Sequence, residues 1–365
     1  MSPRPLVSIV MPCRNEETYI GRALDSILAN DYPKECIEIL VIDGQSTDRS
    51  REIVEQYASR SGQVRFLDNP RVVQTHATNI GLKAAKGDYI IRMDAHAEYA
   101  PEYIRKAVEW IVKTGSDAVG GPVETAPGGE GPAPEAIALA LSSSFGVGNS
   151  HFRLGVREVR AVDTIAFGCY RKDVFERVGL FNENLIRTDD IEFNLRLRRA
   201  GGKLLLVPDV QSKYFARDSF RALARQNFWN GYWVLYSLRY ARMPFSPRHL
   251  VPAAFVLGLT LPLLLSSLWP GLSIISYVVA GTYLATSSIV ALRLCAARKL
   301  KLFPFLVASF AVLHILYGVG SVVGLMKLAV SGMGLTRKTL SAPVHVQKST
   351  TLPLDPNSVR TSSHR

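Results

Sequence analysis

Short apolar runs of strand length alternate with helical patterns over the first hundred residues. The runs 6–11 (LVSIVM) and 37–42 (IEILVI) are nearly continuous stretches of Val, Ile and Leu, which is typical of strands buried on both faces. This alternation predicts an α/β domain with a parallel sheet and right-handed crossover helices. The other expected elements are strands at 64–67 and 89–93 and helices at 19–29, 48–59 and 74–85.

Polar residues follow three of these strands, at the edge of the sheet where ligands bind in parallel α/β folds. Carboxylates, an imidazole and a guanidinium at one edge suit a nucleotide and a divalent metal. Taken singly, Asp43 with Gly44 also fits a plain turn, and Asp48 fits a helix N-cap. The residues are Pro12, Arg14 and Glu16 after the first strand, Asp43 after the second, and Asp94 and His96 after the last.

Three apolar stretches lie toward the C-terminus, at 250–269, 272–292 and 303–326. The first two carry no charge, and each is long enough as a helix to cross about 30 Å of hydrocarbon. The third carries His314 and several glycines, which allow helices to approach closely. Buried helices of a soluble domain are the alternative, but three such stretches in a row favour membrane spans.

The distribution of charge supports the membrane interpretation. Positive and negative residues balance over residues 1–238, so the net charge of +12 comes from the rest of the chain, where Asp355 is the only acid. Basic residues beside apolar spans face the cytoplasm, which predicts a hairpin with both ends there and argues against a nucleic-acid partner. A full third span would place Lys327, Arg337 and Lys338 outside, against this rule. The stretch 303–326 is therefore re-entrant, interfacial or an exception to the rule that basic flanking residues face the cytoplasm.

These patterns divide the chain into three parts. We expect an α/β domain at 1–238, transmembrane or interfacial helices at 239–330 and a polar, disordered tail at 331–365. Residues 1–5 lack the apolar segment of a signal peptide, so the α/β domain should stay on the cytoplasmic face.

Two further segments bear on the site. The Pro- and Gly-rich stretch 125–134 predicts a loop, and the Ser- and Gly-containing segment 142–153 is expected to be able to close over a substrate. The four cysteines are scattered without a C-x-x-C pair, which argues against a structural zinc or iron–sulfur site.

Four motifs follow one another along the first two thirds of the chain. They are VSIVMPCRNEE, VIDGQSTDRS, NIGLKAAKGDYIIRMDAH and TDDIEFNLRLRRAGG. In order and spacing they resemble glycosyltransferase family 2, which has the GT-A nucleotide-sugar-binding fold, over about residues 6–230. The runs MDAHAEY, SSSFGVGNSHFR and VDTIAFGCYRKDVFERVGLF look most like the bacterial membrane glycosyltransferases of succinoglycan-type exopolysaccharide assembly.

The resemblance implies a donor site for a UDP-sugar. Asp43 would contact the base or ribose, and the segment from Pro12 through Arg14 to Glu16 would line the uridine pocket. The metal-binding D-x-D element of the family reads Asp94-Ala95-His96 here. It implies Mn²⁺ or Mg²⁺ held by Asp94 and His96, with Mn²⁺ favoured because imidazole is a poor ligand for Mg²⁺. The alternative for His96 is a hydrogen bond to a phosphate without metal contact.

The resemblance also implies an acceptor side. The family places its catalytic base in an E-D pair before a helix that carries an Arg, and aligning that Arg on Arg196 puts the base at Asp190 and Asp189 in place of the Glu. Helix capping is the alternative for both aspartates. Of the Q-x-x-R-W motif of processive synthases, Gln226 is present and Trp229 replaces the Arg. Both are candidate acceptor-side residues, although polymerisation is doubtful. The aromatic residues of this segment also fit an interfacial helix.

Together these features predict a membrane-anchored inverting glycosyltransferase. It would move a hexose, by resemblance glucose, from a UDP-sugar to a polyprenyl-diphosphate-linked saccharide in exopolysaccharide biosynthesis, on the cytoplasmic face of a bacterial inner membrane. Two alternatives stay open. One is transfer to polyprenyl phosphate itself, which needs a phosphate site that the sequence offers only weakly in Arg221 and Arg225. The other is a catalytically silent, nucleotide-binding membrane scaffold.

Overall fold

The structure, a computed structural model, describes residues 4–241, 249–296 and 299–332. Residues 1–328 belong to one unit, which contains the α/β domain and most of the apolar region. Nearly all of the expected tail, 331–365, lies outside the described residues. The prediction of a disordered tail therefore stays a prediction.

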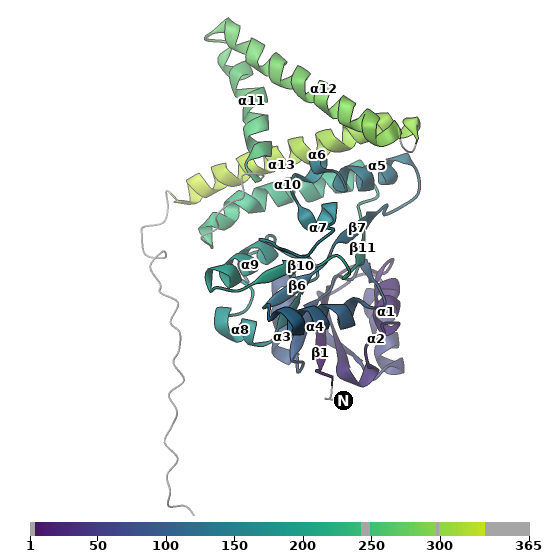
Figure 1. Ribbon diagram of the computed structural model, residues 1–365. Helices are drawn as coiled ribbons and strands as arrows, with labels where there is room; N and C mark the ends of the chain where they lie inside the picture. Colours follow the sequence, from purple (N-terminus) through teal and green to yellow (C-terminus); the bar gives the residue numbers. More distant parts are fainter. Residues whose placement is uncertain (1–3, 242–248, 297–298, 333–365) are drawn as a thin grey trace, which may run out of the picture. The chain divides into compact units, whose positions relative to one another are not determined.

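Eight strands form the main sheet, in the order β3-β2-β1-β4-β9-β6-β10-β8 (Figure 1). The first four strands are parallel, as the sequence predicts, whereas β9 runs antiparallel to β4 and β6. Cys13 and Asp43 are register partners, so the loops that follow β1 and β2 start side by side. The strands are β1 (Val7–Cys13), β2 (Ile37–Asp43), β3 (Val64–Asp68), β4 (Tyr89–Arg92), β6 (Ala118–Gly120), β8 (Arg160–Ala161), β9 (Cys169–Arg171) and β10 (Leu204–Leu206).

Helices cover both faces of this sheet because its central strands are apolar on both sides. Ile9 and Met11 of β1 pack in one core with α1, α2 and α4, and Val10 packs in a second core with α3, α8 and α9. The α/β prediction and its first three helices are thereby confirmed. The helices are α1 (Ile20–Leu28), α2 (Ser50–Arg60), α3 (Gln74–Ala84), α4 (Tyr103–Thr114), α8 (Asp173–Val178) and α9 (Asp189–Arg199).

A smaller sheet, β5-β11-β7, corrects the expected loop at 125–134. Ala126 still pairs with Phe215 in this sheet, and α5 begins at Pro132, where proline is favoured because the first helical N–H groups need no partner within the helix. Only the residues between them form a loop. The elements are β5 (Ala97–Tyr99), β7 (Val123–Ala126), β11 (Ser212–Phe215), α5 (Pro132–Leu141) and the short helices α6 (Ser144–Val147) and α7 (His151–Leu154).

The apolar region forms three helices after α10 (Phe220–Tyr236). They are α11 (Val251–Leu265), α12 (Ser273–Ala296) and α13 (Phe303–Gly332). Within the described residues, the helical segments Pro270–Cys295 and Leu300–Ser331 are long and apolar enough to cross a membrane. α11 is shorter than the expected stretch 250–269. Its length is about 22 Å at 1.5 Å per residue. At its C-terminal end the hydroxyl of Ser266 donates to the carbonyl of Leu263.

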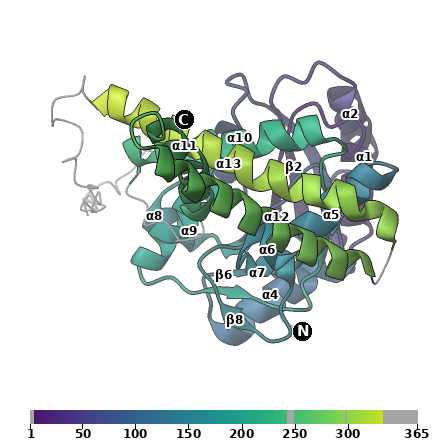
Figure 2. The same ribbon diagram turned by 90° about the horizontal axis from the view of Figure 1, so that it is seen from above.

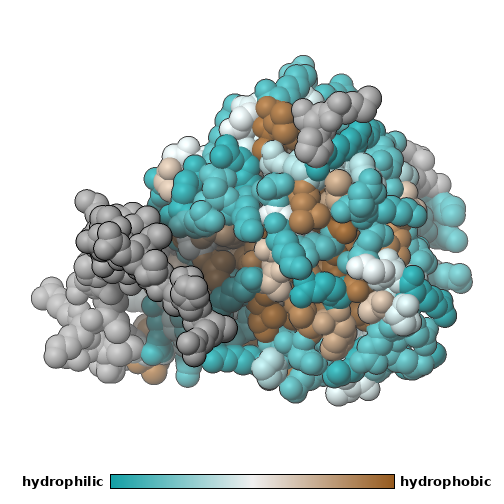
Figure 3. Space-filling view, turned by 90° about the horizontal axis from the view of Figure 1, so that it is seen from below, coloured by the Kyte–Doolittle hydropathy of each residue, from teal (hydrophilic) through white to brown (hydrophobic). Residues whose placement is uncertain are grey.

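Exposed large hydrophobic side chains gather on these helices. Figure 3 views the molecule from the opposite end, where hydrophilic residues surround smaller apolar areas. An exposed apolar surface of this extent marks a membrane or protein contact. Among the exposed residues are Leu261, Leu263, Leu264, Leu268, Trp269, Ile274, Tyr277, Val278, Leu284, Ile289, Met326 and Val330.

Glycines bring α13 and α10 into backbone contact (Figures 1 and 2). A Cβ atom at Gly320 would collide with the carbonyl oxygen of Phe228, and one at Gly324 with that of Tyr232. In the opposite direction, a Cβ at Gly231 of α10 would collide with the carbonyl of Tyr317. Small residues four apart are the usual means of close helix packing in membranes. They fix α13 directly on the last helix of the α/β domain.

Replacing Gly320 with Leu should therefore destabilise the protein by about 2 kcal/mol or more, because the new side chain has no space between the two backbones. We expect the midpoint of thermal unfolding in detergent to fall by about 5 °C. Gly281→Leu on α12 is the matched control, since nothing lies within 4 Å of a Cβ atom at Gly281. Equal midpoints for the two variants would contradict close packing of α10 and α13.

Candidate active site

The loops after β1 and β2 are tied together by hydrogen bonds. Asn15 donates its N–H to Ser46 Oγ at 2.9 Å and accepts the N–H of Thr47 on Oδ1 at 2.8 Å. Asn15 and Gln45 both have positive φ, 54° and 56°, which bends the two loops toward each other. Asp43 is 2% exposed and accepts the N–H of Ser46 at 3.1 Å. Asp43, which is predicted to contact the nucleotide base or ribose, is thus buried where hydrogen bonds hold the two loops together.

The other residues predicted for the donor lie around this edge. Pro12 belongs to β1, paired with Ile42, and Arg14 is exposed with its side chain against Gly44. Glu16 accepts a hydrogen bond or ion pair from His96, with 3.0 Å between Oε1 and Nδ1. The structure therefore brings Glu16 of the first loop and the D-x-H element of the third together.

His96 occupies a charged environment. Burial alone would lower its pKa, but the hydrogen bond to Glu16 and the charge of Asp94 outweigh it and raise the pKa to about 9. Because Glu16 engages Nδ1, Nε2 is the nitrogen left for a ligand. With a pKa of about 9 the imidazole is protonated at neutral pH, so Nε2 donates to a phosphate, and binding of a metal requires the loss of this proton.

A divalent cation would have few protein ligands here. Among the described residues no group of three or more His, Cys, Asp or Glu side chains could hold a metal. Asp94 and His96 could supply two ligands, and phosphate oxygens commonly supply the rest for Mg²⁺ and Mn²⁺. The residues present therefore fit a cation held jointly with a diphosphate.

The two aspartates at the start of α9 differ in their surroundings. Asp189 is 5% exposed, and its Oδ2 lies 3.2 Å from Nη1 of Arg92 at the end of β4. Asp190 is half-buried, and burial together with the charge of Asp189 raises its pKa to about 6. A carboxylate whose pKa is raised toward neutrality is suited to take up a proton. Of the pair, Asp190 is the better candidate base.

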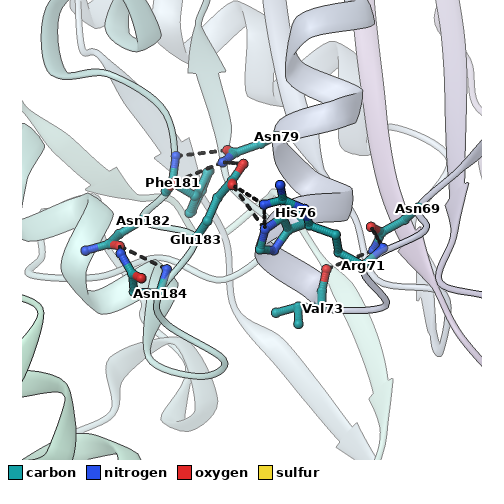
Figure 4. A network of polar contacts seen from close by, with 9 residues as sticks. All are labelled: Asn69, Arg71, Val73, His76, Asn79, Phe181, Asn182, Glu183 and Asn184. Carbon is teal, nitrogen blue, oxygen red and sulfur yellow. Dashed lines mark hydrogen bonds and ion pairs between the residues drawn. The ribbon is translucent and has the colours of Figure 1, made fainter.

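A polar network fixes the loop that leads to these aspartates (Figure 4). Asn79 of α3 donates Nδ2 to the carbonyl of Phe181 at 2.9 Å and accepts the N–H of Phe181 at 3.0 Å. The same Nδ2 reaches Glu183 at 3.0 Å, and Nε2 of His76 lies 3.1 Å from Glu183. On the far side of the loop, Arg196 donates to the carbonyl of Leu180 at 2.8 Å.

Arg92, Asn79 and Glu183 were not singled out in the sequence. Arg92 and Asn79 lie inside the motif NIGLKAAKGDYIIRMDAH, which is the one signal that could have drawn attention to them. Their partners are distant in the chain, so only the fold reveals the contacts.

A cavity of about 590 Å³ lies between the α/β domain and the apolar helices. Asp190 and Gln226 both line it, and Gln226 Nε2 donates to the hydroxyl of Tyr214 at 3.4 Å. Tyr214 in turn meets the ring of His96 edge-on, with centroids 5.3 Å apart. The apolar part of the wall includes Leu141, Phe145, Val251, Pro252, Phe255 and Leu313.

Two of the predicted acceptor-side residues are placed elsewhere. Trp229 is 42% exposed, contacts the rings of Phe228 and Tyr232 and is not part of the cavity wall, so its position agrees better with the interfacial alternative. Asp189 faces Arg92 and is also absent from the wall.

His314 joins the apolar helices to the cavity wall. Its Nδ1 lies 2.9 Å from the hydroxyl of Tyr283 on α12, and its Nε2 lies 2.9 Å from the carbonyl oxygen of Phe145 on α6. The segment 142–153, expected to be able to close over a substrate, is therefore attached to α13.

Comparison with known proteins agrees with this architecture. Residues 8–179 match the family described as Glycosyl transferase family 2. The chain is 29% identical over 282 residues to the dolichyl N-acetyl-alpha-D-glucosaminyl phosphate 3-beta-D-2,3-diacetamido-2,3-dideoxy-beta-D-glucuronosyltransferase of Methanococcus voltae, covering 75% of this chain and 84% of that protein. It is 32% identical over 229 residues to the succinoglycan biosynthesis protein ExoA of Rhizobium meliloti, covering 61% of this chain and 67% of that protein.

A solved structure shares the fold. The mannosyltransferase PcManGT from Pyrobaculum calidifontis, in complex with GDP-Man and Mn²⁺, superimposes with a TM-score of 0.55 at 19% identity, covering 89% of this chain and 88% of that chain. The match to the family, the relatives and the shared GT-A architecture lead to one assignment. The chain belongs to glycosyltransferase family 2, and it is a glycosyltransferase with the GT-A fold.

Proposed function

We propose that the protein is a membrane-anchored inverting glycosyltransferase that moves a hexose, glucose by resemblance, from a UDP-sugar to a polyprenyl-diphosphate-linked saccharide. The reaction would take place on the cytoplasmic face of the inner membrane during exopolysaccharide biosynthesis. One observation carries the proposal. The candidate base Asp190 and the candidate acceptor residue Gln226 line one cavity whose remaining wall includes apolar side chains of α11 and α13.

In this mechanism the acceptor hydroxyl enters the cavity beside Asp190. The carboxylate takes the hydroxyl proton while the oxygen attacks C1 of the donor sugar on the face opposite the diphosphate. The new bond joins the acceptor oxygen to C1, and the bond between C1 and the diphosphate oxygen breaks. The configuration at C1 is inverted, and no covalent nucleophile is required.

The donor would bind at the edge of the sheet. Asp43 and the segment from Pro12 to Glu16 would hold the uridine, and Asp94 and His96 would face the diphosphate. A divalent cation bound there would neutralise charge on the departing diphosphate. The complex of PcManGT with GDP-Man and Mn²⁺ is the basis for expecting a nucleotide sugar and Mn²⁺.

Two observations support a lipid-linked acceptor: the apolar part of the cavity wall and the names of the relatives. The Methanococcus voltae relative is named for a dolichyl-linked acceptor and the Rhizobium meliloti relative for succinoglycan biosynthesis. A long isoprenoid chain needs an apolar path next to the reacting hydroxyl, and α11 and α13 would provide it from the membrane side.

The direct test is transfer in isolated membranes. Membranes containing the protein are incubated with labelled UDP-glucose and Mn²⁺, either with lipid-linked saccharides from an exopolysaccharide producer or with polyprenyl phosphate. Label in the first lipid product, joined by a β-glycosidic linkage if the donor is α-linked, would support the proposal. Label on polyprenyl phosphate alone would favour the simpler acceptor. UDP binding without transfer from any of the common UDP-hexoses would favour the silent scaffold.

The pH dependence of transfer should report on Asp190. Its pKa is raised to about 6, and the base must be ionised, so kcat should be constant above this pH and fall about tenfold per unit below it. The measurement is kcat at saturating donor between pH 4.5 and 8.5. A profile without a break near pH 6, in protein that remains folded throughout, would speak against Asp190 as the base.

A further inference from the structure

Arg153 of α7 carries a charge that no described carboxylate neutralises. Its Nη1 donates to the hydroxyl of Thr125 at 3.4 Å, and its guanidinium lies over the rings of Phe152 and Tyr214, 5.5 and 5.2 Å from their centroids. Within the described residues no ion pair involves it, although most other partly buried arginines have one. Burial lowers the pKa of Arg153, yet an arginine keeps its charge in proteins.

The position of Arg153 is open to ligands. It lines the cavity that holds Asp190 and also a second cavity of about 600 Å³ next to β7 and β11. A buried charge is costly unless an opposite charge compensates it. Arg153 lies between two cavities and has no carboxylate partner among the described residues. A bound anion would therefore compensate its charge.

A second arginine lies in the same situation. Arg187 donates Nη1 to the Asn230 side-chain oxygen at 2.8 Å, and Asn230 lines the Asp190 cavity. Burial and the nearby charge of Arg217 lower the pKa of Arg187, and no described carboxylate lies within ion-pair distance of it. The charge of Asp189 acts on Arg187, but Asp189 is already paired with Arg92. Arg153 lines the cavity directly, and Arg187 reaches its wall through Asn230.

We propose that Arg153 binds the phosphate group of a phosphate ester in the Asp190 cavity. Guanidinium groups bind phosphate through two parallel hydrogen bonds, and a cavity lined by both an arginine and apolar side chains suits an amphiphile. The lipid headgroup of the acceptor is the source that the apolar wall favours, and the diphosphate of the donor is the other. This site rests on the proposed lipid-linked acceptor but not on any catalytic role of Asp190.

The test measures binding without turnover. Full-length protein in detergent is titrated with undecaprenyl phosphate, with UDP in the presence of Mn²⁺, and with the uncharged undecaprenol. Arg153→Met keeps the apolar stem and removes the charge, and Arg153→Lys keeps the charge and removes the planar fork. Arg60→Met, an exposed arginine on α2 with no place in either cavity wall, is the matched control. Thermal unfolding checks that each variant is folded. If Arg153→Met does not fold, Arg153→Lys replaces it in the titrations.

We expect Arg153→Met to weaken the binding of undecaprenyl phosphate at least tenfold and to leave the affinities for UDP and undecaprenol unchanged. Arg60→Met should bind all three ligands as the wild type does. A loss confined to UDP would assign the phosphate site to the donor instead. Unchanged affinity for both phosphate ligands, or equal losses for undecaprenol, would overturn the proposal. Because no sugar is transferred in these titrations, failure here is distinct from failure of the transfer assay.

Discussion

Replacing Asp190 with Asn should reduce kcat for sugar transfer by about 10³-fold, since the acceptor hydroxyl loses the group that removes its proton. The amide keeps the shape of the side chain, so affinity for UDP should change little. The measurement is initial-rate transfer to the lipid fraction, together with UDP titration of the same preparation.

If Asp190 only stabilised the N-terminus of α9, Asp190→Asn should lower the unfolding midpoint and keep its transfer activity. We expect the reverse. Burial raises the pKa of Asp190, so its charged form costs stability above about pH 6, and the unfolding midpoint of Asp190→Asn at pH 7.5 should equal or exceed that of the wild type. Asp173→Asn is the control, because Asp173 also opens a helix, α8. If Asp190→Asn lowered the midpoint and kept its activity, Asp190 would be a helix cap and not a base.

Asp94→Asn should abolish the metal dependence of donor binding. We expect Mn²⁺ to increase UDP affinity in the wild type, and this increase should disappear in the variant, with transfer falling at least 10²-fold as charge on the leaving diphosphate is no longer balanced. The measurement is calorimetric titration of UDP with and without Mn²⁺.

Glu130→Gln, an exposed acid in the loop before α5, is the control for removal of one negative charge. Stronger UDP binding by Asp94→Asn in the absence of metal is compatible with this role, because a carboxylate facing phosphates repels them. Retention of the full Mn²⁺ effect would show that other groups hold the cation.

Local patterns predicted the first half of the fold well. β1 and β2 are continuous apolar runs buried on both faces, and α1 and α2 connect strands that pair in parallel, so periodicity was sufficient there. The segment 125–134 was misleading because Pro and Gly signal a chain break locally, whereas the pairing of Ala126 with Phe215 depends on a strand far along the chain.

The site was predictable in its residues more than in its contacts. Asp190 and Gln226 were chosen by resemblance, and the fold places both on one cavity. The ion pair of Arg92 with Asp189 and the hydrogen bonds of Asn79 to Phe181 join residues that are distant in the sequence. Single-sequence patterns contain no information on such pairs, and the acceptor-side role of Trp229 stays a prediction.

The hydrogen bond from His314 to Phe145 connects α13 to α6, so the apolar helices and the α/β domain share one cavity wall. A truncation ending at residue 238 would keep the loops after β1 and β2 but lose the part of this wall that α11 and α13 form. The truncated protein should bind the donor, and at most hydrolyse it, but it should transfer no sugar to a lipid. Because the partner on α6 is a backbone carbonyl, which any residue at position 145 would supply, the connection depends on the side chain at position 314 alone.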